Sequence, residues 1–179
     1  MKVVQKAYER DGGLCLAADG NVTKKGPTPV IGKAVLSDTR TKLILHAEFV
    51  HRSESDNVNG RVDVEGLNRL LRWISKEKLP LQSLVTKRNP ALGVALKNME
   101  PELGSVRHLY DTSLMVKWLE TELRRVAHRE GCSSILPWIE KVKALLWSAA
   151  EWSPQHSSEV PHRFNACLGQ VTEAKEYKP

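Results

Sequence analysis

The chain has 179 residues, 41% of them hydrophobic, which is enough for one ordinary folded domain with its own core. No apolar run approaches the roughly 20 residues that cross a bilayer, and residues 1–10 lack the apolar stretch of a secretory signal. The three cysteines are widely spaced, which predicts a reducing, intracellular setting without structural zinc. The net charge is +6, from 27 basic and 21 acidic residues, and it permits contact with nucleic acid without proving it.

The first part of the chain predicts three strands and a helix. Three apolar runs between polar turns predict an antiparallel meander, and they cover 14–18, 30–36 and 42–51. In the last run, alternation places Leu43, Leu45, Ala47 and Phe49 on one face. Apolar residues at spacings of three and four then predict a helix over 62–78, which Pro80 ends.

The second part alternates between strands and helices. A strand is predicted over 81–86, a short helix over 90–99 and a short strand over 106–110. Two amphipathic helices follow. Asp111 or Thr112 can cap the first, and Ser133 or Ser134 can cap the second.

The predicted order, β-β-β-α-β-α-β-α-α, is that of α/β proteins with the ribonuclease H-like fold. In that fold the first and fourth strands lie side by side, and their ends hold the first two metal-binding acids. We therefore expect a tail or short helix over 1–13, a truncated ribonuclease H-like domain over 14–152 and a polar tail, loop or frayed helix, over 153–179. Fold analogy alone does not give a function, which depends on the site residues.

A series of short motifs runs in one order along residues 13 to 152. The motifs are Ala18-Asp19-Gly20, Lys25-Gly26-Pro27, Glu65-Gly66-Leu67-Asn68-Arg69, Val85-Thr86-Lys87-Arg88-Asn89, Asp111 to Lys117, and Gly131-Cys132 through Trp138 to Trp147. This series resembles animal proteins derived from DNA transposases, which carry a ribonuclease H-like domain. The resemblance implies that these residues belong to family motifs: Asp19, Gly20, Glu65, Gly66, Arg69, Asp111, Lys117 and Trp138.

The chain differs from this family at the positions of the metal-binding acids. The resemblance implies three acids on two metal ions that cleave and join DNA strands, with Asp19 as the first acid. The second position holds Lys87, with Asn89 in place of a histidine just after it. An ammonium group has no free lone pair for a hard cation, so Lys87 is expected to pair with Asp19 and to replace the metal electrostatically. Asp19 is then a relic of the site and Lys87 its degenerate position, with no metal or cofactor expected.

Five cations near the predicted strand ends are candidates for a phosphate-binding patch, namely Lys24, Lys25, Arg40, Lys87 and Arg88. The alternative is ordinary solvated loop charge. Asp111 is interpreted as a helix N-cap and not as a metal ligand. The six histidines have no metal-binding spacing. Four tryptophans on the last helices predict core packing, or else a surface for a protein partner or a second copy: Trp118, Trp138, Trp147 and Trp152.

These observations favour a catalytically inactive, transposase-derived domain that retains weak DNA or protein binding, with a nuclear location suggested by the ancestry and no membrane partner. One alternative is a magnesium- or manganese-dependent nuclease or transposase fragment, which would use Asp19 with two acids not yet placed. Glu159 and Glu173 are available in the predicted tail. The other alternative is a gene remnant without selected activity. The DNA target, the oligomeric state and the selection of Lys87 stay open at this point.

Overall fold

The computed structural model describes residues 12–24, 29–55, 61–151 and 157–173 of the chain. The chain divides into two compact units, Met1–Tyr110 and Asp111–Pro179. The division falls inside the stretch 14–152 that the sequence groups in one domain, and the expected N-terminal tail lies almost wholly outside the described residues. Within the described residues, no helix has the length and apolar character needed to cross a membrane.

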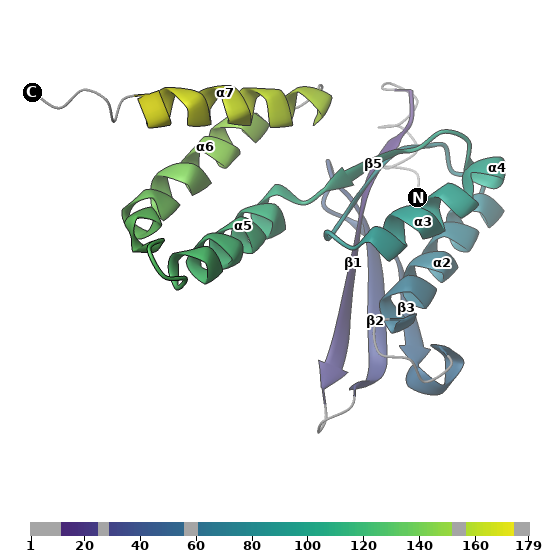
Figure 1. Cartoon of the computed structure of the whole chain (residues 1–179). Helices are drawn as coiled ribbons and strands as arrows, with labels where there is room; N and C mark the ends of the chain where they lie inside the picture. Colours follow the sequence, from purple (N-terminus) through teal and green to yellow (C-terminus); the bar gives the residue numbers. More distant parts are fainter. Residues whose placement is uncertain (1–11, 25–28, 56–60, 152–156, 174–179) are drawn as a thin grey trace, which may run out of the picture. The chain divides into compact units, whose positions relative to one another are not determined.

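The first unit is built on a five-stranded mixed sheet in the order β3-β2-β1-β4-β5 (Figure 1). Its strands are β1 (Leu14–Lys24), β2 (Pro29–Asp38), β3 (Ile44–His51), β4 (Leu81–Thr86) and β5 (Arg107–Tyr110). The first three strands are antiparallel, whereas β4 runs parallel to β1 and β5 parallel to β4. This order and these directions are those of the ribonuclease H-like fold, so the predicted fold class and the adjacency of β1 and β4 are confirmed.

Helices of the first unit cover one face of this sheet (Figure 1). They are α2 (Arg61–Lys76), α3 (Pro90–Asn98) and the short α4 (Glu100–Leu103), and a single 3-10 turn, η1 (Arg52–Ser55), precedes α2. Strand and helix side chains interdigitate in a core whose fully buried members include Leu16, Leu36, Leu84, Leu70, Leu71 and Ile74. The helix expected at 62–78 thus buries its apolar stripe against the meander, as an amphipathic helix must.

Helix α2 approaches β2 closely because two glycines face the contact. A Cβ added to Gly66 of α2 would lie 2.7 Å from Ala34 Cβ, and one added to Gly32 of β2 would lie 2.1 Å from Val62 Cγ1. Real Cβ atoms do not approach this closely, so either side chain would push the helix away from the sheet. The glycine of the Glu65-Gly66-Leu67 motif therefore has a packing role.

We expect Gly66→Ala to lower the free energy of unfolding by about 1–3 kcal/mol, because the added methyl group overlaps Ala34. Alanine also favours the helix by up to about 1 kcal/mol, which offsets part of this cost. Urea unfolding of Gly66→Ala, Ala34→Gly and the double variant measures the effect. The double variant should recover much of the loss. Additive costs in the double variant would contradict the assigned contact.

The faces of β3 differ from the expectation. Leu45 packs against the core, whereas Phe49 of the same predicted face is 63% exposed and Val50 is buried. A register irregularity between Leu36 and Ser37, opposite the start of β3, shifts the alternation there. Period-two alternation identifies two faces, but in an edge strand with apolar residues on both it does not decide which face is buried.

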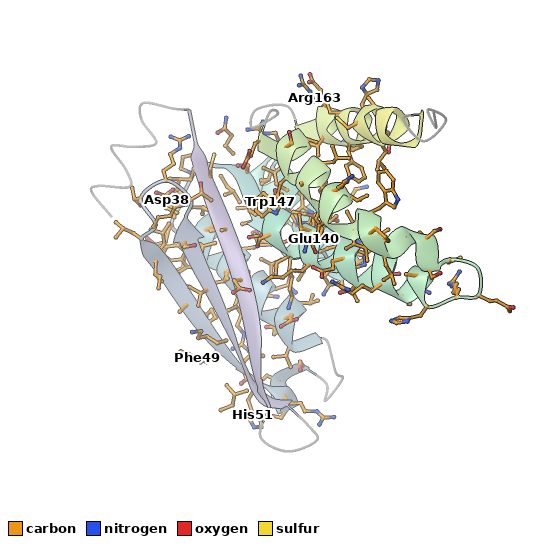
Figure 2. The ribbon with its side chains drawn as sticks, turned by 90° about the vertical axis from the view of Figure 1, so that its left-hand side faces the viewer. Asp38, Phe49, His51, Glu140, Trp147 and Arg163 are labelled. Carbon is orange, nitrogen blue, oxygen red and sulfur yellow. The ribbon has the colours of Figure 1, made fainter. Side chains whose placement is uncertain are left out.

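Asp38 fixes the turn between β2 and β3, at the opposite end of the sheet from His51 (Figure 2). Its Oδ2 accepts hydrogen bonds from the hydroxyl of Thr41 and from the Thr41 backbone amide at 2.8 Å. Burial by itself would raise the pKa of Asp38, but these hydrogen bonds outweigh it and hold the pKa below the usual 3.8.

Because the folded pKa of Asp38 is lowered, its ionised form stabilises the fold fully above the unfolded value of 3.8, and this contribution is lost as pH falls through the lower folded value. We therefore expect the stability difference between the wild type and Asp38→Asn to be constant from pH 7 to about pH 5 and to shrink below about pH 4. Chemical unfolding at a series of pH values tests this. A difference that stays the same down to pH 2 would contradict it.

The second unit is helical in the part that is described. It contains α5 (Thr112–Ala127), η2 (Ser133–Trp138), α6 (Ile139–Glu151), η3 (Ser157–Glu159) and α7 (Val160–Glu173). Asp111 caps α5, as predicted, by accepting a hydrogen bond from Leu114 N at 3.1 Å. Lys143 of α6 pairs with Glu120 of α5 at 2.7 Å. Helix α7 occupies much of the stretch for which the sequence predicts a loop or a frayed helix. Glu140 and Trp147 on α6 and Arg163 on α7 are labelled in Figure 2.

Candidate functional site

Lys87 lies directly after β4, where the strand order brings the end of β4 beside the middle of β1. Its ammonium donates a hydrogen bond to the backbone oxygen of Gly20 at 3.3 Å and forms an ion pair with Oδ2 of Asp63 in the first turn of α2. The Lys87 side chain is 29% exposed and that of Asp63 is 15% exposed. One cation thus connects β1, β4 and α2.

The expected partner of Lys87 was Asp19, and this prediction is wrong. Gly20 is the β1 residue that faces Asp63, since a Cβ on Gly20 would lie 3.3 Å from Asp63 Oδ1. Gly20 pairs in register with Ala34, whose side chain faces α2, whereas Asp19 pairs with Val35. Successive strand residues point to opposite faces, so Asp19 falls on the face away from α2 and is exposed.

Asp63 is the functional candidate that sequence reasoning missed. It lies in the first turn of the predicted helix, outside the Asp19 and Lys87 motifs. The available signal was an acid in the first turn of the helix that follows the meander. Such an acid complements the helix dipole, and the helix carries it to the end of β4 and the middle of β1. Only the packing of α2 on β2 shows that it reaches Lys87.

The residues present do not fit the two-metal site that the fold family implies. Such a site needs several carboxylate oxygens converging on the ions, but Lys87 neutralises Asp63 and Asp19 lies on the other face. Asp19, Asp63 and Lys87 border one small cavity of about 10 Å³, which is room for roughly one water molecule. In the described part of the chain, no three acidic, histidine or cysteine side chains are grouped to hold an ion.

Thr86 holds the backbone in place next to Lys87. Its hydroxyl donates a hydrogen bond to the Lys87 carbonyl at 3.0 Å and lies 2.7 Å from Nε2 of His108 on β5. Because the single Thr86 O–H already donates to the Lys87 carbonyl, the Thr86 oxygen accepts a hydrogen bond from the ring, and His108 carries its proton on Nε2. Burial lowers the pKa of His108, which keeps the imidazole neutral at pH 7. The end of β4 is therefore fixed from the β5 side as well.

The Glu65-to-Arg69 motif has a structural explanation. Arg69 Nε binds Glu65 at 3.0 Å, its NH1 group donates to the Phe49 carbonyl at 3.3 Å, and NH2 pairs with Glu54 of η1. Hydrogen bonds from Arg69, and from the His51 amide, lower the pKa of Glu54. The pair is thus part of a network that ties α2 to β3 and η1, rather than the isolated exposed pair that the i, i+4 spacing suggests.

The proposed phosphate patch does not form one cluster. Lys87 and the exposed Arg88 lie together after β4, but Arg40 lies in the turn after β2, near Cys15 at the start of β1. Because β2 is antiparallel to β1, the end of β2 is brought beside the beginning of β1, away from Asp19. Lys25 and the side chain of Lys24 lie outside the described residues.

The remaining motif residues belong to the helical unit. Hydrogen bonds from Ser113 and Leu114 outweigh the effect of burial and lower the pKa of Asp111, and Lys117 is exposed on α5. Trp138 lies under the ammonium of Lys141, 4.8 Å from the ring centroid. Glu159 pairs with Arg163 at 3.2 Å, and the side chain of Glu173 lies outside the described residues.

The tryptophans are less buried than core packing predicts. Trp118 is 39% exposed and Trp147 is 41% exposed, while Trp138 is half-buried and Trp152 lies outside the described residues. Among the described residues of the helical unit, the buried apolar side chains are Val116, Ala127, Ile139 and Ala149. Two alanines, one valine and one isoleucine make a small core for this unit. The prediction that Trp118 and Trp147 pack in the core is therefore wrong.

No protein-family profile matches the chain, and no curated protein sequence matches it significantly. Among solved structures, it is similar to the N-terminal RNase H domain of Rv2228c from Mycobacterium tuberculosis, with 12% identity, a TM-score of 0.41, and coverage of 55% of this chain and 82% of that one. RNase H1 from Halobacterium salinarum matches with 11% identity, a TM-score of 0.38, and coverage of 54% and 84%. A chain of the simian T-cell lymphotropic virus intasome matches with 19% identity, a TM-score of 0.35, and coverage of 69% and 47%. Likenesses at these identities do not describe the site, which is judged on its own residues.

We expect the Lys87–Asp63 pair to contribute to stability, because both partners are partly buried and link separate elements. In a double-mutant cycle with Lys87→Met and Asp63→Asn, urea unfolding should give a coupling energy of about 1 kcal/mol. The exposed Glu122–Arg125 pair of α5 is the matched control, with a coupling below about 0.5 kcal/mol. Equal coupling in the two cycles would contradict the structural role of the Lys87 pair.

Proposed function

We propose that this chain is a catalytically inactive ribonuclease H-like domain of transposase origin that binds DNA. The observation that carries the proposal is the Lys87–Asp63 ion pair, where β4 ends beside the middle of β1. At this place an active member of the fold would hold a divalent ion between carboxylates. Here an ammonium takes one carboxylate, and the cavity of about 10 Å³ holds no more than a water molecule.

The transposase origin is supported by the order of the motifs along residues 13 to 152 and by a ribonuclease H-like sheet that carries the first of them. Asp19 and Gly20 lie on β1, the Glu65-to-Arg69 segment lies on α2, and Lys87 follows β4. The motifs keep their places in the fold while the acid of the second position is gone. This is the pattern expected of a domain that kept its scaffold and lost its chemistry.

DNA binding is supported by the distribution of charge. The sheet unit, Met1–Tyr110, contains 18 basic and 12 acidic residues and so has a net charge of +6, whereas the helical unit has 9 of each. The whole positive excess of the chain therefore belongs to the unit with the candidate site. Cationic surface of this kind contacts phosphates and gives affinity without sequence specificity.

A role as an interaction module is a second candidate, and the exposure of Trp118 and Trp147 favours it. Tryptophan is enriched at the centres of protein interfaces, where a large flat ring buries much area. A helical unit with a thin buried core has apolar surface available for such a contact.

Manganese titration by calorimetry tests the loss of the metal site. The wild type should show no binding heat and no metal-dependent nicking of plasmid DNA. Lys87→Asp removes the ammonium and places a second carboxylate beside Asp63, so we expect it to bind manganese at least about tenfold more tightly than the wild type.

Two further variants control this experiment. Lys87→Met removes the ammonium without adding an oxygen ligand and should not bind manganese. Adding Asp63→Asn to Lys87→Asp should remove the gain. Tight manganese binding by the wild type, or nicking that Asp19→Ala abolishes, would overturn the inactive assignment and restore the nuclease alternative.

A further inference from the structure

We infer that the Lys87 ammonium makes DNA binding by this domain independent of divalent metal, because it acts as a built-in cation for a backbone phosphate where β4 ends beside the middle of β1. The inference rests on the proposed DNA-binding function and specifies how the site performs it. Lys87 then contributes to DNA binding, in addition to removing a metal ligand.

The first step is the charge at the site. Asp63 borders the same small cavity as Lys87, while Asp19 is exposed on the other face of β1. A carboxylate such as that of Asp63 repels a phosphodiester, and in a metal-dependent site the bound ion overcomes that repulsion. In this chain Lys87 supplies one positive charge beside Asp63 permanently. The repulsion is reduced without an ion.

The second step is the geometry of the ammonium. A lysine ammonium has three N–H donors, and the described partners of Lys87 are the Gly20 carbonyl and the Asp63 carboxylate. These two acceptors hold Nζ just beyond the end of β4, while 29% of the side chain stays exposed. A third donor is then left for a phosphate oxygen that approaches from solvent. The side chain is already ordered by its pair, so binding costs little further side-chain entropy.

The third step is the surroundings. Arg88 follows in the chain and is exposed at the same end of β4. The cavity of about 10 Å³ does not admit a phosphate, so the contact forms at its rim, where Lys87 and not Asp63 is the more exposed partner. The same ammonium that blocks a metal from Asp63 is therefore available to DNA.

Fluorescence anisotropy with a labelled DNA duplex and the full chain tests the inference, first in EDTA and then in magnesium. The wild type should bind in EDTA, and magnesium should only weaken binding, as any added salt does. Lys87→Met should weaken binding roughly three- to tenfold and reduce the slope of log K against log salt by about one. Lys87→Arg should keep most of the affinity.

Lys76→Met is the matched control, since it removes the same charge from the last turn of α2, at the other end of the helix from Asp63. It should change neither the affinity nor the salt slope as much as Lys87→Met does. Asp63→Asn leaves the lysine in place and removes a negative charge, so binding should tighten. A purely structural pair would instead give losses of stability in Lys87→Met and Asp63→Asn without opposite effects on affinity.

The outcomes separate the two proposals. A wild type that binds no duplex in either buffer overturns both DNA binding and this inference. Binding that is equal in Lys87→Met and Lys76→Met, with unchanged salt slope, overturns the inference alone. Binding that appears only with magnesium also overturns it, and points back to a metal-dependent site.

Discussion

The candidate site depends on how closely α2 lies on β2. Gly66 and Gly32 remove two side chains from the contact, so the helix backbone approaches Ala34 and Val62 fits over the strand. A helix displaced by one methyl group would carry Asp63 away from Gly20 and the end of β4, and the ammonium of Lys87 would lose its partner. The packing contact and the ion pair are therefore parts of one arrangement, in which backbone proximity determines which charges meet.

That arrangement changes what the substitution of an acid by lysine means. A lysine beside an exposed Asp19 would be a weak surface pair of little consequence. A lysine held between the Gly20 carbonyl and Asp63 is an ordered cation that neutralises the Asp63 carboxylate. In the proposed function, the same ammonium keeps a divalent ion from Asp63 and offers an N–H donor to DNA.

The motif residues separate into two groups by physical role. Gly66 and the Glu65–Arg69 network are explained by packing and by the attachment of η1 and β3 to α2. Asp111 is explained as the cap of α5. Asp19 has no such structural role in the described residues, because it is exposed on the face away from α2. An exposed acid without a structural contact, in the middle of β1, is what the relic site of the proposed function would leave.

The sequence alone determined the order of the elements and the meander, because apolar periodicity and turn residues are local properties. The adjacency of β1 and β4 followed only from the fold that this order resembles. The sequence also singled out Lys87, since an ammonium cannot ligate a hard cation in any fold. Only the tertiary structure decided the partner of Lys87, the outward face of Phe49 and the separation of Arg40 from Lys87. Those depend on strand register, on the direction of β2 and on the approach of a helix to a sheet. They are relations between residues far apart in the chain, which no local pattern encodes.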